Sequence, residues 1–391
     1  MCPNSADKDH LLRALNLASQ GLGQASPNPC VGTVITDAAG NIAGEATYTY
    51  AGVKHAEVLA LHAAGDRARG GTLYINLEPH AHQGRTPPCT DALIAAGIER
   101  VVASMADPNP KVSGKGFAQL RAAGVQVEVG QFEEQARHLN EAFARYIRYN
   151  LPLVTLKAAM TLDGKIAPPP STSNSTRSHD ANEFSGTWIT GELARSHVHE
   201  LRHQHDALLV GIGTVLADNP ILTDRSGRAR RRPLLRVVLD SHLRLPLDSR
   251  LVQNAASQRT SDLMVFCSLA DAQKKSQLEE LGVRVEQFRA TDPNGRPDLE
   301  AALRHLAEVE IISVMIEGGA TINSAALTSN AVDKVFLYYA PRILGTPDSI
   351  PLTSGAGFRP MIEPARVLRP QMHSFGEDIA IEGYLRDPYA D

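Results

Sequence analysis

Two short motifs, one on each side of a strand-like segment, constrain this chain more than any other feature. The first is K-H-A-E-V, which sets His55 and Glu57 two residues apart, and the second is E-P-H-A-H-Q-G-R-T-P-P-C, which ends at Cys89. Between them, T-L-Y-I-N-L predicts a buried strand at Thr72–Leu77. Imidazole and thiolate bind zinc well, and a nearby carboxylate can move protons without binding the metal. The pattern therefore favours a zinc site with one coordination position open.

The expected zinc ligands are His55, His80 and Cys89, and the expected proton shuttle is Glu57. The signature of zinc deaminases continues from H-x-E to Pro-Cys, a loop, and a second Cys that opens a helix; here His80 follows Pro79, and the second Cys stands at Cys89. Neutral imidazole is also a good zinc ligand, so a tetrahedral site with water in the fourth position remains reasonable. His82 could compete for the metal. The plainer alternative, a polar corner with a first-turn charge and a buried thiol, stays open.

Length and composition indicate a two-domain enzyme with a small-molecule partner. The 391 residues exceed what one core usually serves, and the 43% apolar content is typical of globular domains. A formal charge of −4 with 5% aromatic residues argues against nucleic acid and anionic membrane as partners. Four scattered cysteines and the lack of a signal core or membrane-length apolar run favour the cytoplasm. A homo-oligomer is the usual state of such enzymes.

Helices and strands alternate through the first half. Apolar spacing predicts a helix at Asp7–Gln20, and S-P-N-P-C then leads into a strand at Val31–Thr36. Two prolines hold Asn28 in a rigid turn, from which its amide could read polar groups of a base, although a plain turn asparagine explains the pattern as well. These elements predict a three-layer α/β domain ending near Asn150. The others are strand Ile42–Thr49, helix Ala56–Ala64, strand Thr72–Leu77, helix Thr90–Ala96, strand Arg100–Ser104, helix Gly116–Ala123 and strand Val125–Val129.

Two glycine turns mark the second half. Strand Ala207–Val210 runs into G-I-G-T at Gly211–Thr214, and strand Val314–Ile316 runs into E-G-G-A-T at Glu317–Thr321. The backbone N–H groups of such turns can approach a phosphate, which the following helix dipole also favours. Together with V-V-L-D-S at Val237–Ser241, they suggest a nucleotide laid across the strand ends.

Three further stretches of the second half are given structural roles. Residues 168–182 are polar and predict a mobile surface loop. The helix Gly191–Gln204 carries three histidines, with His205 just beyond it, and a solvated face explains them better than a second metal site. The arginine run at 228–232 is interpreted as a solvated loop rather than as a phosphate site.

The whole set of motifs resembles the bifunctional riboflavin-biosynthesis deaminase/reductase family. In the first half the resemblance is carried by S-P-N-P-C-V-G, H-A-E-V, L-E-P-H-A-H-Q-G-R-T-P-P-C-T-D-A-L-I-A-A-G-I and D-P-N-P-K-V-S-G-K-G. In the second half it is carried by K-A-A-M-T-L-D-G-K, W-I-T-G, L-L-V-G-I-G-T-V-L-A-D-N-P-I-L-T, V-V-L-D-S and I-E-G-G-A-T-I-N. These motifs follow the family order over nearly the whole chain, so the match is highly specific.

The resemblance implies an α/β fold class with an N-terminal cytidine-deaminase-like three-layer domain at 1–149 and a dihydrofolate-reductase-like domain at 150–391. It implies Zn²⁺ and NADPH as cofactors and two reactions. The first is hydrolytic deamination of 2,5-diamino-6-(5-phosphoribosylamino)pyrimidin-4-one, and the second is reduction of the ribosyl side chain to ribityl. The alternative is a reductase only, with the deaminase inactive or redirected to a related pyrimidine, because His80 stands where the family has a zinc cysteine. Tyr48 also stands where the family commonly has a substrate-contacting histidine.

The resemblance also assigns binding residues. Substrate contacts implied for the deaminase are Asn28, His82 and Arg85. Substrate contacts implied for the reductase are Lys157, Thr187, Arg202, Leu222, Arg225 and Glu317. Cofactor contacts implied for the reductase are Met160, Trp188, Thr214, Asp218, Ser241, Gly319, Ala320, Thr321, Ile322, Asn323, Ser324 and Ala325. Arginines suit the substrate phosphate because the guanidinium fork matches phosphate oxygens.

Overall fold

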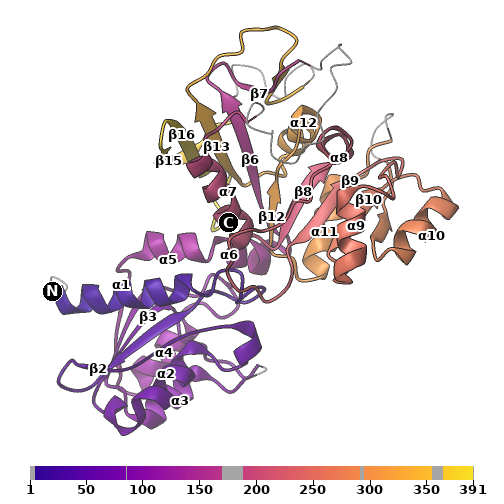
Figure 1. The fold of residues 1–391 in the computed structure, drawn as a ribbon. Helices are drawn as coiled ribbons and strands as arrows, with labels where there is room; N and C mark the ends of the chain where they lie inside the picture. Colours follow the sequence, from indigo (N-terminus) through magenta and orange to yellow (C-terminus); the bar gives the residue numbers. More distant parts are fainter. Residues whose placement is uncertain (1–4, 85, 170–187, 291–294, 355–363, 391) are drawn as a thin grey trace. The chain divides into compact units, whose positions relative to one another are not determined.

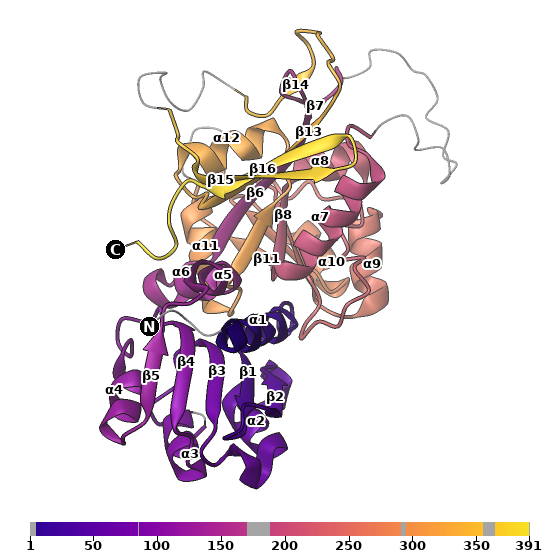
Figure 2. The same cartoon turned by 90° about the vertical axis from the view of Figure 1, so that its left-hand side faces the viewer.

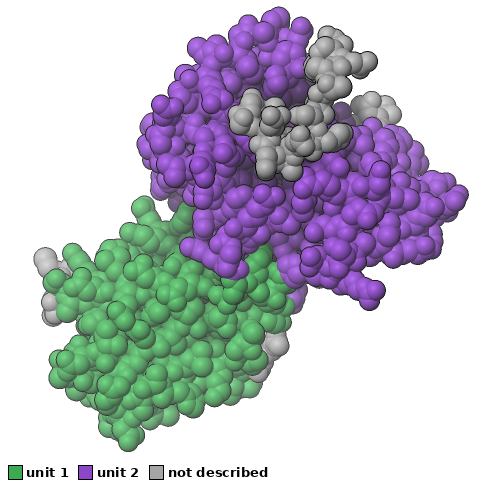
Figure 3. Space-filling model, viewed as in Figure 1, with its two compact units in different colours: residues 1–151, 229–232, 391 green, residues 152–228, 233–390 purple. Residues whose placement is uncertain are grey.

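The computed structural model describes residues 5–84, 86–169, 188–290, 295–354 and 364–390 (Figure 1). The chain divides into two compact units, one of Met1–Leu151 with Ala229–Arg232 and the other of Pro152–Arg228 with Pro233–Ala390 (Figure 3). Each unit has its own sheet covered by helices, which confirms the predicted α/β fold class. Within the described ranges, every helix is too short or too polar to cross a membrane.

The first unit is built on a five-stranded sheet with the order β2-β1-β3-β4-β5 (Figure 2). Strand β1 pairs antiparallel with both β2 and β3, whereas β3, β4 and β5 run parallel. The strands are β1 (Gly32–Thr36), β2 (Ile42–Thr47), β3 (Thr72–Leu77), β4 (Arg100–Met105) and β5 (Gln126–Val129). The helices are α1 (Ser5–Ser19), α2 (Ala56–Ala64), α3 (Cys89–Ala96), α4 (Lys115–Ala122), α5 (Glu133–Leu139) and α6 (Glu141–Tyr149), with short 3₁₀ turns η1 (Tyr50–Gly52) and η2 (Gly65–Ala68).

Both faces of this sheet are buried, because successive side chains of a strand point to opposite faces. Val34 packs in a cluster with Leu11 of α1, while its neighbour Ile35 packs in the cluster that holds Ala60 of α2. Gly44 of β2 lets α2 approach closely, since an added Cβ would lie 2.4 Å from the Ala60 carbonyl oxygen. The sheet therefore fixes where α2 begins.

The second unit is built on a nine-stranded sheet with the order β11-β10-β9-β8-β12-β6-β13-β16-β15. The strands from β11 to β13 run parallel, and β13, β16 and β15 pair antiparallel. The strands are β6 (Leu153–Thr161), β8 (Ala207–Gly211), β9 (Leu235–Leu239), β10 (Leu263–Cys267), β11 (Arg284–Gln287), β12 (Ser313–Ile316), β13 (Lys334–Ala340), β15 (Leu368–Phe375) and β16 (Asp378–Tyr384), with a small separate pair of β7 (Lys165–Ala167) and β14 (Ile350–Pro351). The helices are α7 (Glu192–Gln204), α8 (Ile212–Asp218), α9 (Arg250–Gln258), α10 (Ala272–Glu280), α11 (Leu299–Glu308) and α12 (Ala320–Thr328).

The histidines of α7 are a correction to the sequence analysis, because they do not form a solvated face. His203 is buried and its Nδ1 lies 3.1 Å from an oxygen of Asp224. His205, just beyond the helix, is also buried and bonds the hydroxyl of Thr155. These imidazoles lie in the core with hydrogen-bond partners, as buried polar groups require.

The arginine run is a second correction, since two of its members are tied down by contacts within the first unit. The guanidinium carbon of Arg231 lies 3.4 Å from the ring centroid of Tyr50, and the group also donates to the carbonyl of Ser26. Arg232 donates to the Ser26 hydroxyl. Arg228 alone matches the predicted solvated character, being exposed beside Glu200. The polar loop predicted at 168–182 lies outside the described residues from position 170 onward.

A buried ion pair anchors α1 to the first sheet. Arg100 on β4 donates two hydrogen bonds to the carboxylate of Asp7 in the first turn of α1, at 2.8 and 2.9 Å. The hydroxyl of Tyr74 on β3 donates a third, at 2.7 Å. The hydrogen bonds from Arg100 hold the pKa of Asp7 below its ordinary value. Glu128 also bonds Arg100 but is half exposed.

We expect Asp7→Asn to lower the free energy of unfolding of the first unit by about 2 kcal/mol, because charge-assisted bonds are lost inside the protein. The folded pKa of Asp7 lies below the unfolded value of about 3.9, so its contribution is complete above that value and lost as pH falls through the folded pKa. Denaturant unfolding from pH 7 to pH 3 should show wild type and variant converging at low pH. Glu128→Gln, which removes the exposed partner, should have little effect. A constant difference at all pH values would contradict this account.

Candidate active site

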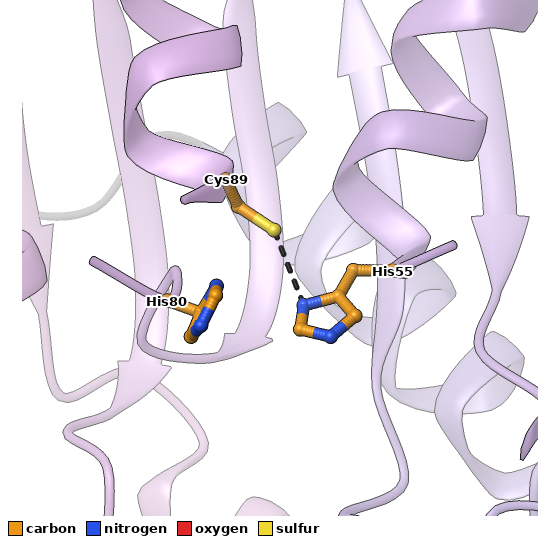
Figure 4. Close-up of side chains that lie close together, drawn as sticks. All are labelled: His55, His80 and Cys89. Carbon is orange, nitrogen blue, oxygen red and sulfur yellow. Dashed lines mark hydrogen bonds between the residues drawn. The ribbon is translucent and has the colours of Figure 1, made fainter. Parts of the chain in front are cut away.

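Three side chains predicted to bind zinc meet where two helices of the first unit begin. His55 is the extended residue directly before α2, and Cys89 is the first residue of α3. His80 lies in the loop that follows β3. Figure 4 shows the three side chains pointing toward one another from these separate segments. Their ligand atoms all lie within 4.8 Å of one another, and no further member joins this group among the described residues.

The closest approach within the group is 3.2 Å, between Nδ1 of His55 and Sγ of Cys89. The rings of His55 and His80 have centroids 4.9 Å apart. Nδ1 of His80 is buried and has no hydrogen-bond partner in the part of the chain that is described. An orphaned imidazole nitrogen facing a thiol and a second imidazole is the donor set that zinc prefers. The residues present therefore fit the metal.

The electrostatics of the group also suit a cation. Burial, with help from His55 and His82, lowers the pKa of His80 to about 4, so this imidazole is neutral at pH 7 and free to donate a lone pair. Burial and then the neighbouring Glu57 carboxylate raise the pKa of the Cys89 thiol. A thiol in such a place gives up its proton only when a metal takes the sulfur.

Glu57 lies in the first turn of α2 and is 3% exposed. Its carboxylate neighbours the Cys89 thiol, whose pKa it raises, and it is not a member of the ligand group. A buried carboxylate beside the ligands, yet separate from them, is where a proton shuttle must be. Glu57 therefore lies where the predicted proton shuttle is expected.

The predicted pyrimidine-binding residues lie around this group to different degrees. Asn28 donates from Nδ2 to the hydroxyl of Tyr48 at 2.6 Å, and the Tyr48 ring meets the edge of His55 at 5.7 Å between centroids. His82 is exposed, with its ring 4.3 Å from that of His80. His82 is outside the ligand group, so it does not compete for the metal in this arrangement. Arg85 lies outside the described residues.

Three predicted substrate contacts of the second unit form one buried cluster. Arg202 of α7 donates to both carboxylate oxygens of Glu317, at 2.7 and 3.0 Å, and Nζ of Lys157 lies 3.6 Å from the same carboxylate. Each of the three side chains is 13% exposed. Burial would raise the pKa of Glu317, but the two cations lower it strongly instead. Two cations on one carboxylate leave a net charge of +1, which suits an anionic substrate.

Sequence reasoning missed the aromatic support of this cluster. Nζ of Lys157 lies 5.7 Å from the ring centroid of Tyr338, whose hydroxyl is 2.7 Å from Nδ1 of His197. In the sequence, F-L-Y-Y of β13 places Phe336 and Tyr338 two residues apart, and side chains two apart on a strand share one face. This pattern identifies a strand but no partner, because β13 meets α7 and β6 only in the tertiary structure.

The two glycine turns follow neighbouring strands, as a nucleotide site requires. Strands β8 and β12 pair directly, and Glu317 N donates to the Leu209 carbonyl across them. Neither Gly211 before α8 nor Gly319 before α12 offers a side-chain cap, so the first N–H groups of both helices keep free directions. A Cβ added at Gly319 would meet nothing within 4 Å. The residues therefore fit a phosphate-bearing cofactor.

The other predicted cofactor residues fall around these strand ends with differing exposure. Ser241 follows β9, the neighbour of β8, and Asn323 is buried with its Oδ1 lacking a partner among the described residues. Met160 is buried in β6, opposite Tyr339 of β13. Trp188 is 52% exposed. Thr214 and Asp218 lie on α8, and the residues Ala320, Thr321, Ile322, Ser324 and Ala325 lie on α12.

Two predicted substrate residues flank the buried cluster, and a third cannot be placed. Arg202 donates to the Thr223 carbonyl and Arg225 to the Thr223 hydroxyl, so the two arginines are neighbours. Leu222 is buried with a φ of 59°. Thr187 lies outside the described residues.

By fold and chemistry the first unit is a metal-dependent hydrolase of the deaminase type, and the second is a nucleotide-dependent reductase. Comparisons with known proteins agree. Residues 4–105 match the family model of the cytidine and deoxycytidylate deaminase zinc-binding region, and residues 152–380 match that of the RibD C-terminal domain.

Full-length relatives give the same result. The chain is 40% identical to the riboflavin biosynthesis protein RibD of Actinobacillus pleuropneumoniae, over 98% of this chain and 96% of that one, and 36% identical to RibD of Escherichia coli strain K12, over 96% and 98%. Among solved structures, it matches RibD of Acinetobacter baumannii with a TM-score of 0.80 at 34% identity, covering 97% of this chain and 98% of that one. The deaminase/reductase of Thermotoga maritima matches with a TM-score of 0.77 at the same identity and coverage.

The chain belongs to the RibD family of riboflavin biosynthesis proteins. It is therefore a bifunctional enzyme with a zinc-binding deaminase domain and an NADPH-dependent reductase domain, as the sequence motifs predict. No observation favours the reductase-only alternative.

His80, which stands where the family has a zinc cysteine, gives the prediction for this site. We expect the purified protein to hold about one zinc per chain, and His80→Ala to weaken zinc binding at least about tenfold in competition with a chelator, because one of three protein ligands is lost. His82→Ala is the matched control: this imidazole is adjacent but outside the ligand group, so zinc affinity should not change. Equal losses in the two variants, or none in His80→Ala, would contradict the assignment of His80.

Proposed function

We propose that residues 1–149 remove an amino group from 2,5-diamino-6-(5-phosphoribosylamino)pyrimidin-4-one and that residues 150–391 reduce the ribosyl group of the product to ribityl. The observation that supports the first step most strongly is the convergence of His55, His80 and Cys89 beside the buried Glu57. For the second step it is the buried charged cluster of Lys157, Arg202 and Glu317.

In the deamination, His55, His80 and Cys89 would hold the zinc, which when bound would supply a Lewis acid that makes water a better nucleophile. Glu57 takes a proton from the attacking water and returns protons to the pyrimidine nitrogen and the departing amine, so that ammonia leaves and a carbonyl remains. Asn28 and His82, with Arg85, bind the pyrimidine and its phosphoribosyl group.

In the reduction, NADPH supplies the hydride that reduces the opened ribosyl group. The helix starts after Gly211 and Gly319, whose backbone N–H groups lack side-chain caps, would hold its phosphates. The substrate lies against Lys157, Arg202 and Glu317, with Arg225 and Thr187 beside it. Lys157 is the cation of this cluster that can also donate a proton, whereas an arginine keeps its protons.

We further propose that the enzyme works in the cytoplasm as a homo-oligomer on small-molecule substrates, without nucleic acid. The three described cysteines are all free and buried, which suits a reducing compartment. The formal charge of −4 gives no general attraction for nucleic acid. Size-exclusion chromatography with light scattering tests the oligomeric state directly.

The deaminase assignment predicts that Glu57→Gln loses about a thousandfold in the rate of ammonia release, since general acid–base catalysis is removed. The same variant should keep its zinc, because Glu57 is outside the ligand group, and should oxidise NADPH with the deaminated substrate at the wild-type rate. Ammonia release within about tenfold of wild type would show that another group moves the proton. A wild-type enzyme that holds zinc but releases no ammonia would refute the deaminase proposal itself.

The reductase assignment predicts that Arg202→Ala raises the KM for the deaminated substrate about tenfold or more. The change removes one of two cations from Glu317 and takes the cluster from a net +1 to neutral, so an anionic phosphate is held less well. The Kd for NADPH should stay within about twofold of wild type, because its proposed contacts lie elsewhere. Arg228→Ala is the matched control, because this exposed arginine is paired with Glu200 of α7, the helix that also carries Arg202. Equal effects of both changes on KM would contradict a specific role for Arg202.

A further inference from the structure

Tyr48 contacts two residues of the deaminase site, Asn28 and His55, in addition to its packing in the core. It is 5% exposed and packs with Ala25, Cys30 and Ala56. Its backbone N–H donates to the Val31 carbonyl, which fixes the backbone from which the side chain extends. Because Ala56 is the first residue of α2, the ring is held directly beside the helix start that carries His55.

The Tyr48 hydroxyl sets the orientation of a substrate-facing amide. Asn28 donates to it from Nδ2 at 2.6 Å, and Asn28 is itself fixed by its own N–H, which donates to the Ala25 carbonyl. An asparagine amide presents an acceptor at one end and two donors at the other, so a bond to Nδ2 decides which end remains. Oδ1 of Asn28 has no donor among the described residues and is left as an acceptor.

The ring of Tyr48 contacts the metal-binding side of the same site. It meets His55 in an edge-to-face arrangement, with centroids 5.7 Å apart and planes at 81°. Such pairs are favourable and restrict the rotation of both rings. Thr86 and Cys89 contact the two nitrogens of His55, so with Tyr48 the imidazole is held on three sides.

We propose that Tyr48 is a positioning residue of the deaminase: its hydroxyl holds Asn28 so that Oδ1 accepts an N–H of the aminopyrimidine, and its ring edge holds His55 in place. The inference rests on the proposed role of Asn28 at the substrate. It also predicts substrate specificity, since an acceptor at Asn28 Oδ1 favours pyrimidines that present an N–H to it over those that present a carbonyl oxygen. A carbonyl would meet an unpaired acceptor, which costs binding energy.

Tyr48→Phe separates the two parts of this role, because it removes the hydroxyl and keeps the ring. We expect the KM for deamination to rise about tenfold with kcat changed less than about threefold, since a binding group loses its orientation. Zinc content and reductase rate should stay at wild-type values. In an Asn28→Ala background, which should itself raise KM about tenfold, Tyr48→Phe should add less than about twofold, because the two residues act as one unit.

The matched control is Tyr74→Phe, which removes a hydroxyl that is equally buried and bonded to Asp7 in the same unit. Its KM for deamination should equal that of wild type. A wild-type KM in Tyr48→Phe, or fully multiplicative effects of Tyr48→Phe and Asn28→Ala, would overturn the inference while leaving the deaminase assignment intact. If Tyr48→Phe folds poorly, a second measurement decides. Calorimetry compares the affinity of the undeaminated substrate for Glu57→Gln with its affinity for Glu57→Gln/Asn28→Ala, and equal affinities would overturn the inference. A wild-type enzyme without ammonia release would instead refute the proposed function.

Discussion

The deaminase site depends on two helices that begin at one edge of the first sheet. His55 ends the segment before α2 and Cys89 opens α3, so these two residues are fixed by helix starts, whereas His80 lies in the loop after β3. The position of α2 is set by its contact with β2, where Gly44 leaves room for the helix backbone. A side chain at Gly44 would push α2 outward and carry His55 and Glu57 with it. Close packing at this glycine therefore helps to position His55 and Glu57.

Substitution of an imidazole for a thiolate changes the charge of the site more than its shape. One thiolate and two neutral imidazoles leave zinc with a net charge of +1, whereas two thiolates and one imidazole leave it neutral. The low pKa of His80 keeps its ring neutral, so it does not repel the metal. A more positive centre acidifies water more strongly but is held by less negative charge. A zinc held by His55, His80 and Cys89 would therefore be a stronger Lewis acid held by less ligand charge.

Sequence patterns predict those parts of the structure that depend on local spacing. Helix Ala56–Ala64 and strand Thr72–Leu77 occur with the predicted bounds, because apolar periodicity and a closing glycine specify them locally. The ligand group could be predicted because zinc restricts the choice of side chains. The solvated face predicted for the α7 histidines is wrong, since His203 and His205 find Asp224 and Thr155, which are distant in sequence. The Asn28–Tyr48 bond and the support of Lys157 by Tyr338 were not predicted, because pairings across a fold leave no periodic signal.

The buried cluster of the second unit shows why such pairings matter for function. Burial lowers the pKa of Lys157, and the Glu317 carboxylate opposes that shift. Burial alone would raise the pKa of Glu317, but Arg202, with its bidentate bond, and Lys157 lower it instead. Lys157 and Glu317 each favour the charged form of the other, whereas Arg202 keeps its charge without them. Tyr338, with its hydroxyl bonded to His197, places an aromatic face near the lysine ammonium and limits its motion. The net positive charge is thus a property of the assembled cluster and not of any single residue.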